Sequence, residues 1–404
     1  ALNELVLHHD ILRAVYKEGR LCIVSYEKSK RYDYYTFDYS GKKVSEEEIS
    51  SICTKIQASI DLEQGPLVKA AHFKTDQGNY LMLCIHHLIT DGVSWRILEE
   101  DLAIAIRQIK ENEIVKLPAK TASYQEWAEA LQEYRGSSKL KAEIDYWREI
   151  EKEIGPNQIQ LPLESGENSG GELEIEFSQE ETETLLHAAR GGAHNAELQE
   201  LLLAALGMAV KEVTGQDKVA VMLEGHGRES IHKQIDVDRT VGWFTSMYPV
   251  ILRCGMDAEQ VIIETKEMMR HIPNNGIGYS VLKNGCFDVP VDICFNYLGE
   301  MDAERKKEIA LPCGISISQS NQLPGRIQLN GAITNNRLHF TMNYARGLVV
   351  EKVQLLAEKY QEYIMQIQRD GRIQTVSDVY AGNELDLEDI VFLNSLFSNG
   401  TGQA

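Results

Sequence analysis

The sequence predicts a mixed α/β (α+β) protein built from two lobes of similar size, and three observations support this prediction. Segments with the periodicity of strands and of amphipathic helices alternate along the chain. The segment LPLESGENSGGE (161–172) has no such periodicity, and the alternation restarts after it. The chain has 404 residues, which is enough for a hydrophobic core in each lobe. We therefore expect an N-terminal lobe of residues 1–162 and a C-terminal lobe of residues 163–404.

The N-terminal lobe begins with ALNELVLHHDILRAVY (1–16), which is typical of a helix already under way, so we expect further residues before it. A helix over 45–60 is predicted by its period and by Ser45, a helix-capping residue followed by acidic side chains in the first turn. Alternation of apolar and polar residues predicts the strands. The expected strands are 21–26, 32–39, 69–74 and 80–87, and the other expected helices are 95–110, 123–134 and 139–150.

The C-terminal lobe shows the same kinds of segment. The expected strands are 173–177, 218–223 and one that ends near Tyr297, and the expected helices are 179–189 and 197–213. The segment NNGIGYS (274–280) reads as a glycine-bearing loop, spaced too loosely to hold a phosphate. The longest nearly unbroken apolar run, 201–210, is about half of what a membrane span needs, and no secretory signal pattern opens the chain. We therefore expect a cytoplasmic protein without a membrane partner.

Composition excludes several classes of partner and site. The chain carries 41 basic and 61 acidic residues, and this net charge of −20 would repel the backbone of a nucleic acid. The seven cysteines are odd in number and never spaced Cys-x-x-Cys, so we expect free thiols in a reducing cytosol and no zinc site. No nucleophile elbow, phosphate-binding loop or dinucleotide fingerprint is present in the sequence. The kind of catalysis that these exclusions leave is acid–base chemistry without a cofactor or metal.

The first candidate for such chemistry is HHLITDGVSW (86–95). If 80–87 is a strand, His86 and His87 point to opposite faces, so that one can face an interior and the other a cavity. Histidine suits proton transfer near neutral pH because its ordinary pKa is about 6.5. Asp91 and Gly92 would form a tight turn, with Gly92 free to adopt a positive φ. The alternative is a buried structural histidine before a simple turn.

Further candidates lie at the ends of two strands in the second half. In VMLEGHGRES (221–230), Glu224 follows an apolar strand beside glycines, and a partly desolvated carboxylate there can act as a base. The alternative is a polar loop with local ion pairs. In ICFNYLGE (293–300), a strand delivers Asn296 and Tyr297, for which the alternative is a structural tyrosine. The aromatic residues of DRTVGWFTSMYPV (238–250) are interpreted as packing residues.

Taken together, these motifs resemble the epimerization domains of nonribosomal peptide synthetases, a family of the condensation-domain superfamily. The similarity extends from His8 to about Phe397, with four motifs in the family's order: HHLITDGVSWRIL (86–98), EGHGRE (224–229), RTVGWFTSMYP (239–249) and FNYLGE (295–300). The family's opening Pro-Ile-Gln-x-Trp-Phe-like segment is absent here. LHHDILRAVY (7–16) resembles the superfamily's Arg-His-Glu-x-Leu-Arg segment, with His8 in place of the first Arg and Asp10 in place of the Glu, whereas Arg13 matches the second Arg. Glu200 stands where the family usually has Asp.

The resemblance implies two chloramphenicol-acetyltransferase-like lobes in a V-shaped pseudo-dimer with a channel between them. It implies an aminoacyl or peptidyl thioester as substrate, carried on the phosphopantetheine arm of a peptidyl carrier domain, in the synthesis of peptide antibiotics that contain D-amino acids. The reaction equilibrates the L and D forms at Cα. The isolated domain is expected to be a monomer without a cofactor of its own, whose partners are the carrier domain and adjacent synthetase modules.

The resemblance also implies roles for individual residues. We expect His87 and Glu224 to face each other across the substrate as the acid–base pair, and either one can remove the proton from the L form. Tyr297, with Asn296 nearby, would stabilise or protonate the enolate. The remaining motif residues would support the site: Asp91 paired with Arg13 to hold the motif loop, His86 as a structural residue, and Gly92, Ser94 and Trp95 as the continuation of the motif.

Two alternatives to an epimerase are considered. A condensation domain would share the fold and His87, but would join two carrier-bound substrates by forming an amide. The Ser-Trp pair after Gly92 and the carboxylate at Glu224 argue against it, since condensation needs no opposing carboxylate. The other alternative is a docking module without catalysis, which would have no chemical need for the pair of His87 and Glu224.

Overall fold

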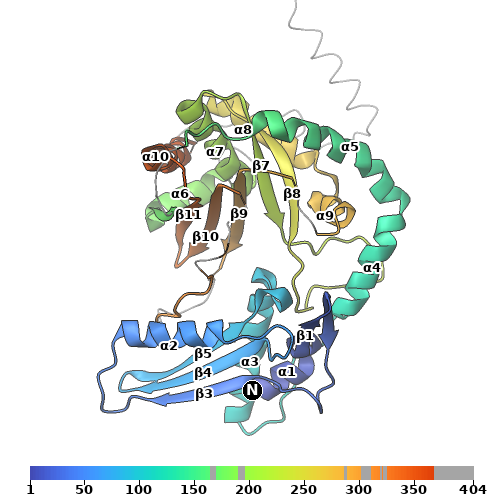
Figure 1. Cartoon of the computed structure of the whole chain (residues 1–404), viewed down its shortest axis with the longest axis vertical. Helices are drawn as coiled ribbons and strands as arrows, with labels where there is room; N and C mark the ends of the chain where they lie inside the picture. The colour runs from blue at the N-terminus through green and yellow to red at the C-terminus, as the bar shows by residue number, and fades with distance from the viewer. Residues whose placement is uncertain are drawn as a thin grey trace, which may run out of the picture.

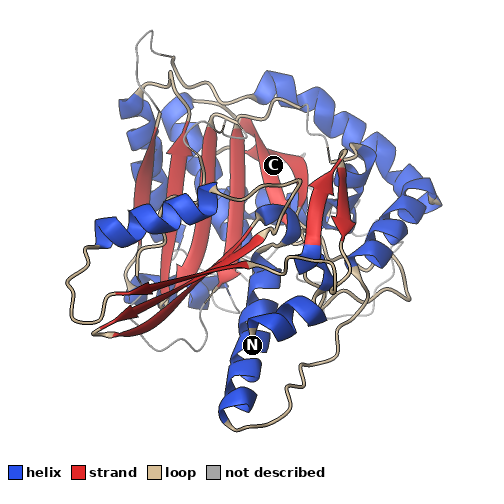
Figure 2. Ribbon diagram, turned by 60° about the horizontal axis from the view of Figure 1, so that its bottom comes forward, coloured by secondary structure: helices blue, strands red, loops and turns tan. Residues whose placement is uncertain are grey.

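The fold is described from a computed structural model and covers residues 1–163, 170–189, 196–285, 289–301, 311–318, 321 and 325–367. Two lobes are visible in Figure 1, the N-terminal one at the bottom in blue and the C-terminal one above it. Each has its own β-sheet covered by helices, as the view coloured by secondary structure shows (Figure 2). The predicted α/β class is confirmed.

The N-terminal lobe is built on a three-stranded sheet in the order β3 (Asp33–Asp38), β4 (Val68–Thr75) and β5 (Gly78–Ile85). Helix α2 (Glu46–Ala58) begins at Ser45, whose side chain accepts a hydrogen bond from the backbone of Glu48, as its sequence predicts. It covers one face of the sheet. The lobe is completed by α1 (Leu2–His8), a hairpin of β1 (Ala14–Lys17) and β2 (Arg20–Ile23), and the long helix α3 (Gly92–Lys110).

The C-terminal lobe is built on a six-stranded mixed sheet. Its strands, in spatial order, are β6 (Gly171–Glu176), β11 (Arg337–Tyr344), β10 (Ile327–Thr334), β9 (Ile293–Glu300), β7 (Lys218–Gly225) and β8 (Ser246–Arg253). Strand β9 is parallel to both β7 and β10, and the other pairs are antiparallel. The helices of this lobe are α6 (Gln179–Ala189), α7 (Leu198–Thr214), α8 (Ala258–Arg270), α9 (Ile277–Leu282) and α10 (Val350–Ile367).

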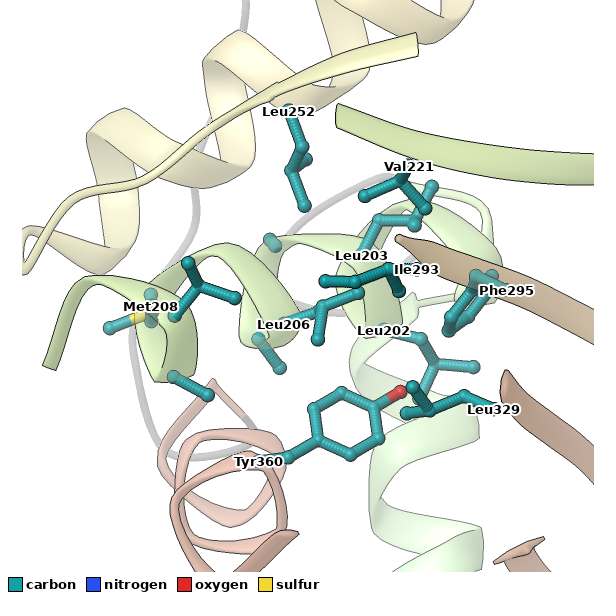
Figure 3. Packing of buried hydrophobic residues seen from close by; sticks show 14 of the residues in the cluster. Leu202, Leu203, Leu206, Met208, Val221, Leu252, Ile293, Phe295, Leu329 and Tyr360 are labelled. Carbon is teal, nitrogen blue, oxygen red and sulfur yellow. The ribbon is translucent and has the colours of Figure 1, made fainter. Parts of the chain in front are cut away.

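Helix α7 explains the longest apolar run of the sequence. Every residue from Leu201 to Val210 is buried, because the helix lies between the sheet and helix α10 and is covered all round. Figure 3 shows Leu203 and Leu206 of this helix among side chains of the sheet and Tyr360 of α10. Within the described residues, no helix is both long enough and apolar enough to cross a membrane.

Two helices connect the lobes and do not pack where the expected boundary puts them. Helices α4 (Tyr124–Gly136) and α5 (Ser138–Ile154) precede residue 162, yet α5 packs against β8 and α9 of the C-terminal lobe. Trp147 of α5 is 2% exposed and belongs to the C-terminal core. An amphipathic pattern shows that a helix has a partner, but it does not show which sheet that partner is.

Several local predictions were wrong. The predicted opening helix ends at His8, and Ala14–Lys17 is a strand. The strand predicted over 80–87 ends at Ile85. The predicted loop 274–280 contains a short helix, α9, after a turn in which Asn274 and Asn275 have positive φ. Part of the predicted linker, 164–169, lies outside the described residues. So does Cys286, whereas the six other cysteines are free thiols, as predicted.

We predict that Leu203→Ala lowers the free energy of unfolding by about 2–5 kcal/mol, because it removes a fully buried side chain from the C-terminal core. Leu163→Ala is the matched control, since Leu163 is 68% exposed, and its effect should stay within about 0.5 kcal/mol. Urea unfolding followed by circular dichroism measures both. Equal losses in the two variants would contradict the assigned packing of α7.

Candidate active site

His86 and His87 lie just after β5, in the turn that leads to helix α3. His86 caps a short 3₁₀ turn over His87–Ile89, and its Nδ1 accepts a hydrogen bond from the backbone N–H of Leu88 at 3.2 Å. It is half-buried, and burial lowers its pKa, as does the neighbouring His87. The different surroundings of the two histidine side chains are due to this turn and not to the alternation of side chains along a strand. His86 thus has the surroundings of a structural residue.

His87 is exposed, and one of its ring nitrogens is fixed by the backbone. Its Nδ1 lies 2.7 Å from the carbonyl oxygen of Thr90. A carbonyl oxygen only accepts hydrogen bonds, so Nδ1 carries the proton and the neutral ring presents the lone pair of Nε2. The ring also contacts Trp243, with centroids 5.7 Å apart. His87 is therefore arranged as a base at Nε2.

Asp91 joins the two lobes. Its carboxylate caps α3 by accepting the N–H of Ser94 at 2.7 Å, and it also accepts the N–H of Phe244 at 3.0 Å and a hydrogen bond from Arg228 at 3.3 Å. Asp91 is 4% exposed. The expected partner was Arg13, and this expectation is wrong: the Arg13 guanidinium donates to backbone carbonyls of its own lobe, including that of Val24 at 3.1 Å.

Arg228 is the residue that the sequence analysis missed. Its guanidinium stacks over the Phe244 ring at 3.8 Å and donates to the carbonyl oxygens of Val237 at 2.6 Å and Thr240 at 2.8 Å, as well as to Asp91. A planar guanidinium can satisfy several acceptors at once, whereas a lysine ammonium cannot reproduce this geometry. The only signal in the sequence was its place in the EGHGRE motif.

The Ser-Trp pair after Gly92 has a structural role. Ser94 is fully buried, and its hydroxyl donates to the carbonyl oxygen of Gly242 at 2.9 Å and accepts the N–H of the same residue at 3.0 Å. Trp95 packs against the core of the N-terminal lobe. Gly92 is the first residue of α3 and does not have the positive φ that was expected, because Asp91 caps a helix there and no tight turn forms.

Glu224 lies near the end of β7, on the sheet face of Ala220 and Met222. It is half-buried, and this burial raises the pKa of its carboxyl group, while His87 is close enough to lower that pKa again. The structure thus places Glu224 of the C-terminal lobe within electrostatic range of His87 of the N-terminal lobe. A carboxyl group with a raised pKa within electrostatic range of an imidazole base is an arrangement suited to proton transfer.

Asn296 and Tyr297 lie on opposite faces of β9. Strand β9 runs parallel to β7 with Met222 paired to Cys294, so alternation places Asn296 on the face of Glu224. Burial and, secondarily, the charge of Glu224 raise the pKa of the Cys294 thiol to about 12, which is consistent with this shared face. Tyr297 points to the other face, where it packs against the C-terminal core and lies near the buried Tyr360.

A second cluster of titratable side chains lies at the lobe junction. Among the described residues, His8, His9 and Asp101 could together offer ligands to a metal ion. However, both carboxylate oxygens of Asp101 already bind protein groups, His9 at 2.8 Å and Arg239 at 2.6 Å. The nearby cation of Arg239 opposes a metal ion, so we interpret the cluster as a second ion pair between the lobes.

Comparison with known proteins identifies relatives along the whole chain. The family model of the condensation domain matches residues 1–380. Surfactin synthase subunit 1 of Bacillus subtilis (strain 168) is 36% identical over 424 residues, which cover 98% of this chain and 12% of that protein. Gramicidin S synthase 1 of Brevibacillus brevis is 36% identical over 423 residues, which cover 96% of this chain and 38% of that protein. The chain thus spans a minor part of these relatives.

Two solved structures of synthetase domains also resemble this chain. The epimerization domain from the third module of tyrocidine synthetase B is 34% identical, with a TM-score of 0.81 over 91% of this chain and 87% of that one. The first condensation domain of the CDA synthetase is 18% identical, with a TM-score of 0.69 over 92% of this chain and 87% of that one. The latter likeness shows the shared fold alone.

We predict that a double-mutant cycle detects coupling between Asp91 and Arg228 and none between Asp91 and Arg13. Arg228→Gln should lower the free energy of unfolding by about 3–5 kcal/mol, because it leaves a buried carboxylate without its cation. Combined with Asp91→Asn, it should show a coupling energy of about 1–3 kcal/mol. Urea unfolding of the single and double variants measures this. A larger coupling of Asp91 with Arg13 would contradict the observed pairing.

We predict that Glu224→Gln stabilises the fold at neutral pH. Because burial raises the folded-state pKa of Glu224, the folded protein holds this proton more tightly than the unfolded chain, and stability is lost as the pH rises through the folded-state pKa. Glutamine does not titrate, so the stability of the variant relative to wild type should increase as the pH rises above about 4.3, the ordinary pKa of glutamic acid. Glu259→Gln, at an exposed position, should show no such increase.

Proposed function

The chain belongs to the condensation-domain family, and we propose that it epimerizes the Cα atom of an aminoacyl or peptidyl thioester carried on a phosphopantetheine arm. The observation that carries this proposal is the pair of His87 and Glu224, one from each lobe, close enough for the charge of His87 to act on the Glu224 carboxyl. Inversion at Cα needs one group that removes a proton and another that returns a proton to the opposite face. Two proton-transfer groups on opposing lobes meet this need.

The reaction is balanced by these two side chains alone. In one direction Nε2 of His87 takes the Cα proton, the C–H electron pair moves into the enolate of the thioester, and the protonated Glu224 gives its proton to Cα from the other side. In the reverse direction Glu224 is the base and the His87 imidazolium is the acid. The hydrogen bond from Nδ1 to Thr90 keeps Nε2 as the reacting nitrogen in both directions.

The raised pKa of Glu224 supports this use of a carboxyl group. An exposed glutamic acid has a pKa of about 4.3 and holds very little proton at neutral pH. Burial increases the fraction of Glu224 that is protonated and makes its carboxylate a stronger base. Proton transfer is most efficient when the pKa of the catalytic group approaches the working pH. The pKa that burial raises therefore helps Glu224 both to donate a proton and to remove one.

The enolate oxygen needs a hydrogen-bond donor. Asn296 lies on the strand face of Glu224 and offers an amide group there. Tyr297 could stabilise the enolate only if its hydroxyl reached the face of Glu224 from the opposite, core-facing side of β9. Tyr297 is therefore a weaker candidate for this donor than Asn296. We therefore give Asn296 the first role in stabilising the enolate.

The relatives support the proposed substrate and partners. They include synthases of surfactin and gramicidin S, and a solved relative is an epimerization domain of tyrocidine synthetase. We propose that this chain works beside carrier domains and further modules, that it needs no cofactor of its own, and that it functions in the cytoplasm. A condensation reaction would use His87 but has no need of a carboxyl group opposite to it.

We predict that this chain, given a carrier domain loaded with an L-aminoacyl group in deuterated water, yields a mixture of D and L forms with deuterium at Cα. Chiral chromatography of the released amino acid and mass spectrometry measure both quantities. Retained L configuration without deuterium would refute epimerization. Amide formation with a second loaded carrier domain, in place of exchange, would identify condensation.

Variants test the assignment of the pair within the same assay. Glu224→Gln and His87→Ala should each lower the exchange rate by about 100-fold or more, because each removes one proton-transfer group. Matched controls are Glu259→Gln and His232→Ala, which change the same residue types at positions away from the pair. If either active-site variant retains the wild-type rate, the assignment of that residue fails even where exchange itself is observed.

A further inference from the structure

Trp243 is an exposed aromatic side chain in a segment that is otherwise buried. It is 43% exposed, whereas Val241 is 3% and Phe244 is 5% exposed. Single exposed apolar side chains are common on protein surfaces, so this exposure alone assigns no role to Trp243. We expected the aromatic residues of this motif to be packing residues, and for Trp243 the structure shows otherwise. The contacts of its ring therefore decide which role it has.

The backbone around Trp243 is fixed to the N-terminal lobe on both sides. The preceding residue, Gly242, has its N–H and its carbonyl oxygen bound to the Ser94 hydroxyl. The carbonyl oxygen of Trp243 accepts the hydroxyl of Tyr124 at 2.6 Å, and the N–H of Phe244 is bound by Asp91 at 3.0 Å. Four hydrogen bonds thus hold three consecutive residues, and the indole is presented from a rigid backbone.

The indole is presented to His87. The two ring centroids lie 5.7 Å apart with an angle of 51° between the ring planes. An aromatic ring attracts a cation that lies over its face within about 6 Å of the ring centroid, and tryptophan is the most effective side chain for this. His87 also interacts electrostatically with His86 beside it and with Glu224 from the opposite lobe.

We propose that Trp243 is a positioning residue for His87: its indole restricts the orientation of the imidazole and stabilises the imidazolium formed when Nε2 takes up the Cα proton. This inference rests on the proposed function for its use in catalysis. The effect of the indole on the orientation and charge of the His87 ring does not depend on that function. The hydrogen bond to Thr90 fixes one edge of the imidazole, and the indole limits rotation of the ring about that contact.

The first test measures His87 directly and needs no enzymatic activity. The protonation of His87 is followed by NMR of the ¹⁵N-histidine-labelled chain, with the signal assigned by its loss in His87→Ala. We expect Trp243→Leu to lower the midpoint of His87 titration by about half a pH unit, since the imidazolium loses an attraction of modest size. Trp243→Phe should lower it less. An unchanged midpoint in Trp243→Leu would overturn the proposal.

The second test separates positioning from substrate binding and from folding. In the exchange assay, Trp243→Leu should lower kcat several-fold, shift the acidic limb of the pH profile to lower pH and leave KM nearly unchanged. A change confined to KM would instead identify Trp243 as a wall of the substrate site and overturn the proposal. Tyr34→Leu, at a site 53% exposed on the N-terminal sheet, is the matched control for loss of an exposed aromatic ring. Urea unfolding should show nearly equal stability for both variants.

The two tests also keep this inference distinct from the proposed function. If the wild-type chain shows no exchange at Cα but the His87 midpoint falls in Trp243→Leu, the epimerase proposal fails and the contact stands. If exchange is observed and the midpoint does not move, the proposed function stands and the role of Trp243 fails.

Discussion

The carboxylate of Asp91 is the contact on which the arrangement of the two lobes depends, because it is bound from both lobes at once. Ser94 of its own lobe donates to it, and so do Phe244 and Arg228 of the other lobe. A buried ion that loses one of its partners is strongly destabilising, since its charge is then neither solvated nor paired. The motifs around these residues are therefore interdependent, although they lie more than a hundred residues apart in the sequence.

Features that depend on local sequence could be predicted. Helix α7 was predicted from its period, and helix α2 from its period and its serine cap. That His87 and Glu224 lie near the end of a strand could also be predicted, because in each case an apolar run ends in polar residues beside glycine or a turn. The exact strand ends differ, since β5 ends at Ile85 before His87 and β7 still includes Glu224. In such places a fold presents side chains at the edge of a sheet, and no long-range information is needed to expect it.

Features that depend on contacts between distant segments could not be predicted. Arg13 and Arg228 are both plausible partners for Asp91 by charge, and only the docking of the lobes selects Arg228. The faces of Asn296 and Tyr297 follow from the register between β9 and β7, which no single segment specifies. Helix α5 likewise shows an apolar face in the sequence without showing which sheet receives it.

The ion pair lies next to the two proposed catalytic residues in the sequence as well as in space. Asp91 follows His87 by four residues (91 − 87), and Arg228 follows Glu224 by four residues (228 − 224). Only a short segment therefore separates each of these two residues from the Asp91–Arg228 contact. A rotation of one lobe against the other about this contact moves distant parts of the lobes much more than it moves His87 relative to Glu224. Small rotations of the lobes about this contact are thus compatible with a nearly constant geometry of His87 and Glu224.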